Sequence, residues 1–318
     1  MLRRFALAAL LSSSLLAVPA LAEYPDKPIH IVVPFAPGGS VDIMARLIAE
    51  KIAQPMGQSV IVDNKPGGGS AVGTEFVAHS PADGYTLLMG STSSLSINPS
   101  LQKLRYEVTD FAPITLVASV PHVLVINPKV PAKNLREFIA WAKAAPKVNY
   151  GSAGPGTPHH LAGVMLNQMA GLKVVDIPYK GTGPALVDLV GGQVDVMSVD
   201  LPPAMPFISS NKVRVLGIAT NARSPLAPDI PTISEEGLPG FVVTGWYGVV
   251  APAAVPKDIA EKLGKAISDA LAQPDTREKL LKIGATPEGG TPQAFGEHMQ
   301  REYAKWAKVI KDGNIKLE

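Results

Sequence analysis

Short strands that end in glycine-rich turns and lead into amphipathic helices recur along most of this chain. Ile29–Val33 is a β-branched run, and residues 34–40 (PFAPGGS) separate it from residues 41–56, whose apolar side chains recur at helical spacing. The same order of strand, glycine turn and helix returns over residues 148–152 and 159–171. This alternation predicts parallel strands covered by helices, that is, an α/β fold.

The alternation occurs in two adjacent units, and a length of 318 residues also suggests two domains. Residues 114–128 form a long extended stretch that can run from the first unit into the second, and residues 246–252 can run back. We therefore predict two lobes, each with a mixed, mainly parallel sheet, joined by a two-strand hinge around a ligand cleft. The expected boundaries are 23–122 plus 247–318 for lobe 1 and 123–246 for lobe 2.

The first 22 residues have the three parts of a secretory signal peptide. Arg3 and Arg4 are followed by an apolar stretch and by Ala20-Leu21-Ala22, a small-x-small cleavage signal. A transmembrane anchor is the weaker reading, because the apolar stretch is short and interrupted by serines. We expect cleavage after Ala22 and export to the periplasm of a Gram-negative host, and the choice between the general and the twin-arginine route stays open.

Composition excludes several classes of site. The chain has no Cys, which rules out disulfides, a thiol nucleophile and cysteine-ligated metal centres. The formal net charge is only +2, so no broad basic surface for nucleic acid is expected. No nucleotide-binding glycine motif, no HExxH and no GxSxG is present, so we expect neither a cofactor nor a metal.

Three glycine-rich turns stand before predicted helices, at residues 34–40, 151–158 and 180–184. Thr157 is a suitable N-cap with Pro158 at the first helical position, Ser40 is a candidate cap for the first helix, and Pro184 is expected to open the third. A helix N-terminus offers unpaired N–H groups and partial positive charge, so each turn is a candidate carboxylate site. Ordinary turn chemistry remains the alternative for each turn.

Side chains near these turns add candidates. Hydroxyl groups follow the strands of lobe 1, Phe35 can form an apolar wall, Lys180 can bring a cation to the cleft or remain solvated, and Asp200 ends a strand where it can face the cleft or cap a turn. His159 and His160 are expected to form a partly exposed helix start rather than a metal site. The full set of candidate ligand contacts is Phe35, Ala36, Gly38, Gly39, Ser70, Ser91, Thr92, Ser152, Gly154, Gly156, Thr157, His159, Tyr179, Lys180, Gly181 and Asp200.

Several longer strings resemble the Bug family, the periplasmic solute-binding proteins of tripartite tricarboxylate transporters. They are YPDKPIHIVVPFAPGGSVDIMARLIAEKI, NKPGGGSAVGTEFVAHSPADGYTLLMG, NYGSAGPGTPHHLAG, PYKGTGPALVDLVGGQVDVMSVDLP and PTISEEGLPGF, in family order over essentially the whole mature chain. The resemblance implies a two-lobed type II periplasmic binding fold that closes on a small carboxylated ligand. It also implies that the loops at 35–39 and 152–157 hold carboxylates, and that Asp200 can meet an amine on an amino-acid ligand. Leu201 departs from the family wording there.

The expected function is capture of a small carboxylated metabolite by hinge closure, without catalysis. The cargo is expected to be a dicarboxylate, a tricarboxylate, an aromatic acid or an acidic amino acid, delivered by a monomeric receptor to the membrane permease subunits of a tripartite tricarboxylate transporter. Two alternatives remain: a ligand-sensing adaptor for a two-component sensor, and a periplasmic enzyme on the same scaffold.

Overall fold

The structure is a computed structural model that describes residues 24–225, 227–312 and 315. The expected signal peptide lies outside the described residues, and so does Gly313, which the sequence predicts as the end of the last helix. No described helix is both long and apolar enough to cross a bilayer.

One half of the molecule is built on parallel strands flanked by the return strand. β1 (Ile29–Val33) lies between β2 (Val60–Asn64) and β3 (Thr86–Ser91), parallel to both, and β9 (Thr244–Pro252) runs antiparallel to β3. Its helices and single turns are α1 (Ser40–Met56), η1 (Gly68–Ser70), α2 (Ala71–Ala78), η2 (Ser93–Ile97), α3 (Asn98–Leu101), η3 (Val108–Asp110), α8 (Lys257–Ala272), α9 (Pro274–Lys282) and α10 (Pro292–Asp312).

The other half repeats the parallel arrangement on a smaller scale. β5 (Asn149–Ser152) lies between β6 (Val175–Pro178) and β7 (Val196–Asp200), parallel to both, and β7 pairs antiparallel with β4 (Phe111–Ile126). The helices of this half are α4 (Leu135–Ala144), α5 (Pro158–Ala170), α6 (Thr182–Gly191) and α7 (Leu201–Ser209). β8 (Arg214–Ile218) and β10 (Thr286–Gly289) also pair with β4.

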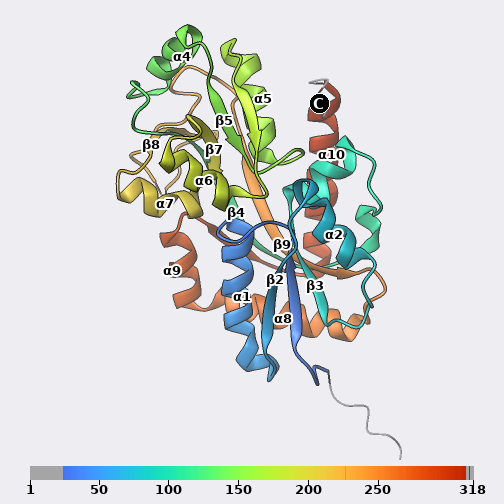
Figure 1. The fold of residues 1–318 in the computed structure, drawn as a ribbon. Helices are drawn as coiled ribbons and strands as arrows, with labels where there is room; N and C mark the ends of the chain where they lie inside the picture. The colour runs from blue at the N-terminus through green and yellow to red at the C-terminus, as the bar shows by residue number, and fades with distance from the viewer. Residues whose placement is uncertain (1–23, 226, 313–314, 316–318) are drawn as a thin grey trace, which may run out of the picture.

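β4 joins the two halves because it changes partners along its length. Its first part pairs with β9 as far as Pro121 opposite Thr244, and its second part pairs with β7 from His122 opposite Asp200. Just before β9 the chain is tied to the second half, since the Val243 carbonyl accepts the His122 N–H. Figure 1 shows β4 and β9 running between the lower half with α1, α8 and α9 and the upper half with α4 to α7. This is the expected two-lobed α/β arrangement with two extended crossings.

The apolar core is divided in the same way as the strands. One cluster gathers the buried faces of α1 and α8 on β1 and β3, while separate clusters pack α4 and α5, and α6 and α7, on the strands of the second half. Trp306 on α10 packs with Ile97 and Leu161, so the last helix reaches across to α5. The sequence predicts Trp141 and Trp306 as core residues on helices. Trp306 is buried, and Trp141 is partly buried against the core.

Some local expectations are confirmed and others are wrong. The Thr157 hydroxyl accepts the His160 N–H at 3.2 Å, as a cap should. The N-cap of α1 is Gly39 rather than Ser40, and α6 starts at Thr182 after Gly181, two residues before Pro184. The sequence patterns gave no indication of α2, α7, α9 and β10, which are short elements, and α7 and α9 also contain proline in their first turn.

We expect Phe138→Ala to lower the free energy of unfolding by about 3–5 kcal/mol, because the ring is fully buried in the core of the second half and its removal leaves a cavity. Phe76→Ala is the matched control, since that ring is 47% exposed and should cost under about 1 kcal/mol. Urea unfolding followed by circular dichroism measures both. Equal losses of unfolding free energy in the two variants would contradict the burial of Phe138 in the core of the second half.

Candidate functional site

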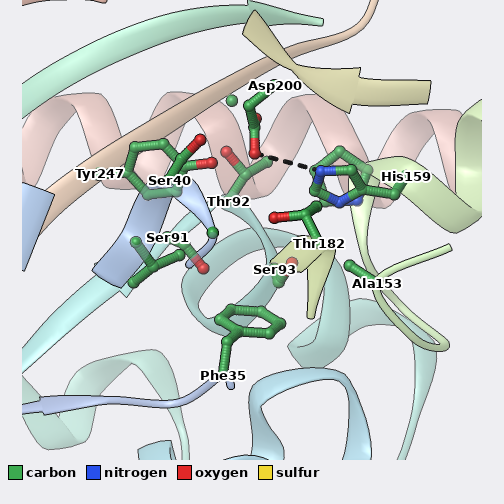
Figure 2. A pocket seen from close by; sticks show the side chains of 14 residues that line it. Phe35, Ser40, Ser91, Thr92, Ser93, Ala153, His159, Thr182, Asp200 and Tyr247 are labelled. Atoms are coloured by element: carbon green, nitrogen blue, oxygen red, sulfur yellow. Dashed lines mark hydrogen bonds and ion pairs between the residues drawn. The ribbon is translucent and has the colours of Figure 1, made fainter. Parts of the chain in front are cut away.

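A small cavity lies where the two halves meet (Figure 2), and about 20 Å³ of it is open to the centre of a water molecule. Its wall is rich in hydroxyl groups, which come from both halves and from β9: Ser40, Ser91, Thr92, Ser93, Thr182 and Tyr247. The remaining lining residues are Phe35, Gly39, Val41, Ala153, Pro158, His159, Asp200 and Gly245. The arrangement combines an apolar ring at one end with polar groups that converge from several elements.

The structure places the predicted candidates in three groups. Six of them line this cavity: Phe35, Gly39, Ser91, Thr92, His159 and Asp200. Ser70, Tyr179 and Lys180 line a second cavity, which shares Phe35 and Ala153 with the first. The other candidates border neither of these two cavities: Ala36, Gly38, Ser152, Gly154, Gly156, Thr157 and Gly181.

Several backbone donors expected to receive a carboxylate are engaged within the protein. The Ala36 N–H donates to the Lys180 carbonyl at 2.7 Å, and the Gly38 N–H donates to Asp42 at 3.1 Å. The Gly154 N–H lies 3.3 Å from the Ser152 hydroxyl. A ligand that used these donors would have to replace the bonds that they make in this structure.

The glycine loops of the two halves touch each other beside the cavity. Besides the Ala36–Lys180 hydrogen bond, a Cβ on Gly69 would lie 1.8 Å from the carbonyl oxygen of Pro155 in the opposite half. A Cβ on Gly156 would lie 1.7 Å from the Asn98 side chain. Glycine is therefore required at Gly69 and Gly156 by the approach of the other half, and the cavity is closed off on this side.

A buried ion-paired group forms one wall of the cavity. Asp200 stands at the end of β7, 1% exposed, with Oδ1 at 3.0 Å from His122 Nε2 and Oδ2 at 3.3 Å from His159 Nε2. The first pair has the distance of an ion pair without the alignment of a hydrogen bond. The two imidazole rings lie 4.5 Å apart between centroids. We call His122, Asp200 and His159 the triad.

The triad corrects one expectation and adds a residue that sequence reasoning missed. His159 was expected to be partly exposed, but it is buried because the helix start is folded against Asp200. His122 lies on β4 among apolar residues, and its pairing with Asp200 across the strands became visible only with the register. Thr182, Ser93 and Tyr247 were also missed as lining residues; Thr182 belongs to the third glycine turn, which was the available signal.

The electrostatics of the triad fix its ionisation. Burial alone would raise the pKa of Asp200, but the two imidazoles outweigh it and hold that pKa well below its usual value. Burial lowers the pKa of His159, and the Asp200 charge only partly offsets this effect. Burial and the Asp200 charge raise the pKa of Tyr247, so its hydroxyl stays protonated. Asp200 is therefore an ionised carboxylate that faces two imidazoles inside the protein.

The three side chains also offer ligand atoms within 4.8 Å of one another, a spacing found in metal sites too. Each oxygen of Asp200, however, faces its own imidazole nitrogen at a distance that suits an ion pair. We therefore interpret the triad as charge pairing. The absence of a metal remains a prediction from the sequence.

Comparisons with known proteins show similarity to one receptor family. The family model described as "Tripartite tricarboxylate transporter family receptor" matches residues 44–315. The protein BugT of Bordetella pertussis is 38% identical over 311 residues, which cover 95% of this chain and 94% of BugT.

Two similar solved structures contain a ligand. Rpa4515 of R. palustris with adipate is 34% identical with a TM-score of 0.88, over 92% of this chain and 99% of that one. MatC of Rhodopseudomonas palustris with bound malate is 36% identical with a TM-score of 0.86, over 90% of this chain and 100% of that one.

We expect Asp200→Asn to lower the free energy of unfolding at neutral pH by about 3–5 kcal/mol, because it removes the charge that the buried histidines pair with. The folded-state pKa of Asp200 is depressed, so this contribution is complete above about pH 4 and is lost as pH falls through the folded pKa. Chemical unfolding over a pH series measures it. The exposed pair His30–Asp63 provides the control Asp63→Asn, which should cost under about 1 kcal/mol; equal effects would contradict the role given to the triad.

Proposed function

Because the chain belongs to the receptor family of tripartite tricarboxylate transporters, we propose that it captures a small carboxylated metabolite by closing two lobes around the cavity described above. The observation that carries this proposal is the cavity itself, which lies between the two halves and is lined by hydroxyl groups from both. The adipate and malate bound by two similar proteins support a carboxylate as the ligand class.

The proposed closure turns on the two extended crossings. We place the hinge where β4 changes partners, between Pro121 and His122, and where residues 243–244 lead into β9. This hinge lies within three residues of the lobe boundaries expected from the sequence, which are 23–122 plus 247–318 and 123–246. Ligand contacts made by both lobes favour the closed state, and the exclusion of water strengthens each hydrogen bond to a carboxylate.

The cellular setting follows from the family and the first segment. We propose that the signal peptide is cleaved after Ala22, that the mature protein works in the periplasm as a monomer, and that the closed form docks on permease subunits of the transporter. The cargo is a dicarboxylate, a tricarboxylate, an aromatic acid or an acidic amino acid. Similar proteins described by function are binding proteins and receptors, which supports capture without catalysis.

We expect at least one carboxylate in a panel that includes adipate and malate to raise the melting temperature of the protein after refolding free of carried-over ligand. At a hundred times the dissociation constant a ligand adds about 2.7 kcal/mol of stability. Adipamide, the uncharged analogue of adipate, should give no shift. A folded protein that responds to no mono-, di- or tricarboxylate, aromatic acid or acidic amino acid would contradict the proposed function.

We expect Gly69→Ala to weaken carboxylate binding at least tenfold, or about 1.4 kcal/mol, because the added methyl meets Pro155 only when the lobes are together. Gly171→Ala is the matched control: both glycines have a left-handed φ, of 59° and 62°, but nothing lies within 4 Å of a Cβ at Gly171. Isothermal titration calorimetry measures both variants. If both bind like the unmodified protein, closure by contact of these loops is wrong.

A further inference from the structure

The proposed carboxylate site contains a carboxylate of its own. Asp200 lines the cavity and is ionised, and a ligand carboxylate in the same enclosed space would be repelled by it. Among the described residues that line the cavity there is no Lys or Arg to offset that repulsion. Lys180, a candidate cation for the cleft, lines the neighbouring cavity instead. The histidines of the triad are therefore the titratable source of positive charge at this wall.

The charge of the triad depends on how many protons it holds. Asp200 contributes one negative charge, and each imidazole contributes one positive charge when it is protonated. With one protonated imidazole the triad is neutral, and with two it is a cation. Without a ligand, a neutral triad avoids an unpaired charge in the cavity. With an anion bound, a cationic triad is favoured because the two opposite charges attract.

His159 is the imidazole of the triad that reaches the cavity. Its Nε2 faces Asp200, while its Nδ1 is buried and has no hydrogen-bond partner among the described residues. A neutral imidazole carries one N–H, but a protonated one carries two. Protonated His159 can donate to Asp200 and to a ligand carboxylate at once, and Figure 2 shows it on the cavity wall with Thr182 and Ala153 nearby.

Resting on the proposed function, we propose that the triad takes up one proton when a ligand carboxylate enters the cavity, so that His159 becomes the cation that holds the ligand. The receptor then binds its cargo together with a proton. The geometry gives Asp200 a defined part: it orients and stabilises the imidazolium, while the ligand supplies the second negative charge.

The surroundings of His159 give the sign of the pH dependence. The titratable groups that face it are Asp200 from β7 and His122 from β4, and Tyr150 from β5 binds its backbone carbonyl. Burial lowers the pKa of His159 without ligand, and a bound carboxylate would raise it. Because binding raises this pKa, affinity is highest at low pH and falls as pH rises between the ligand-free and the ligand-bound value.

The same arrangement disfavours an amine at Asp200. Both carboxylate oxygens already face an imidazole nitrogen, so an ammonium group would have to displace one of them. The possibility that Asp200 receives the amine of an amino acid is thus replaced by recognition of a second acidic group. Dicarboxylates without an amine are the ligands that fit a cationic triad.

The test counts protons directly. Malate and adipate are titrated into the unmodified protein by isothermal calorimetry near pH 7.5 in buffers of different ionisation enthalpy, and then over a pH series in which both ligands are fully ionised. We expect close to one proton taken up per ligand, and a dissociation constant that rises by up to about tenfold per pH unit. Binding with no proton uptake and no pH dependence would overturn this inference and leave the proposed function intact, whereas no carboxylate binding at all would overturn both.

Two variants and one additive assign the proton to the triad. His159→Gln is expected to bind either ligand more weakly and with a flat pH profile, and unchanged proton uptake in it would contradict the inference. His30→Gln removes the matched exposed pair with Asp63 and should keep the behaviour of the unmodified protein. EDTA should change nothing, and binding that is lost in EDTA and restored by Zn²⁺ would replace the proton with a metal. The proton count on the unmodified protein stands even if His159→Gln fails to fold.

Discussion

The burial of Asp200 between two imidazoles is the interaction on which the site depends. A carboxylate without a partner would not remain charged at this depth, because desolvation would raise its pKa until it took up a proton. Its partners come from separate elements: His122 from β4 and His159 from the first turn of α5. Tyr247 on β9 completes this wall and stays protonated beside the charge. The triad therefore ties the crossing strand to the ligand-facing helix at the place where the lobes meet.

The backbone supplies the second constraint, which is the close approach of the two halves. β4 serves both halves by changing partners at Pro121 and His122, so the two sheets are held together while each keeps its own core. The glycine loops then meet so closely that Gly69 and Gly156 leave no room for a side chain. In this structure the loops bond to each other, and the cavity behind them is lined by side-chain hydroxyls together with apolar residues.

More of the fold than of the site could be predicted from the sequence. Strand and helix periodicity and the Thr157 cap are local signals, so the alternating units and the crossings were predictable. Which loops face each other depends on strand register and on the approach of the lobes, and neither leaves a periodic trace. His122 illustrates this limit, since only its place opposite Asp200 in the sheet distinguishes it from an ordinary residue of an apolar strand. The hydrogen bonds that occupy the backbone N–H groups of Ala36 and Gly38 could likewise not be predicted, because they depend on how the folded loops approach their acceptors.

In the proposed complex, a ligand carboxylate lies inside the cavity and contacts His159. A crystal structure of the protein grown with malate or adipate tests it most directly. We expect a carboxylate group of the ligand within hydrogen-bond distance of His159 Nδ1 and of the hydroxyls around it, with the Ala36–Lys180 bond intact. A ligand bound outside this cavity, or bound in it without contact to His159, would show that His159 does not hold the carboxylate.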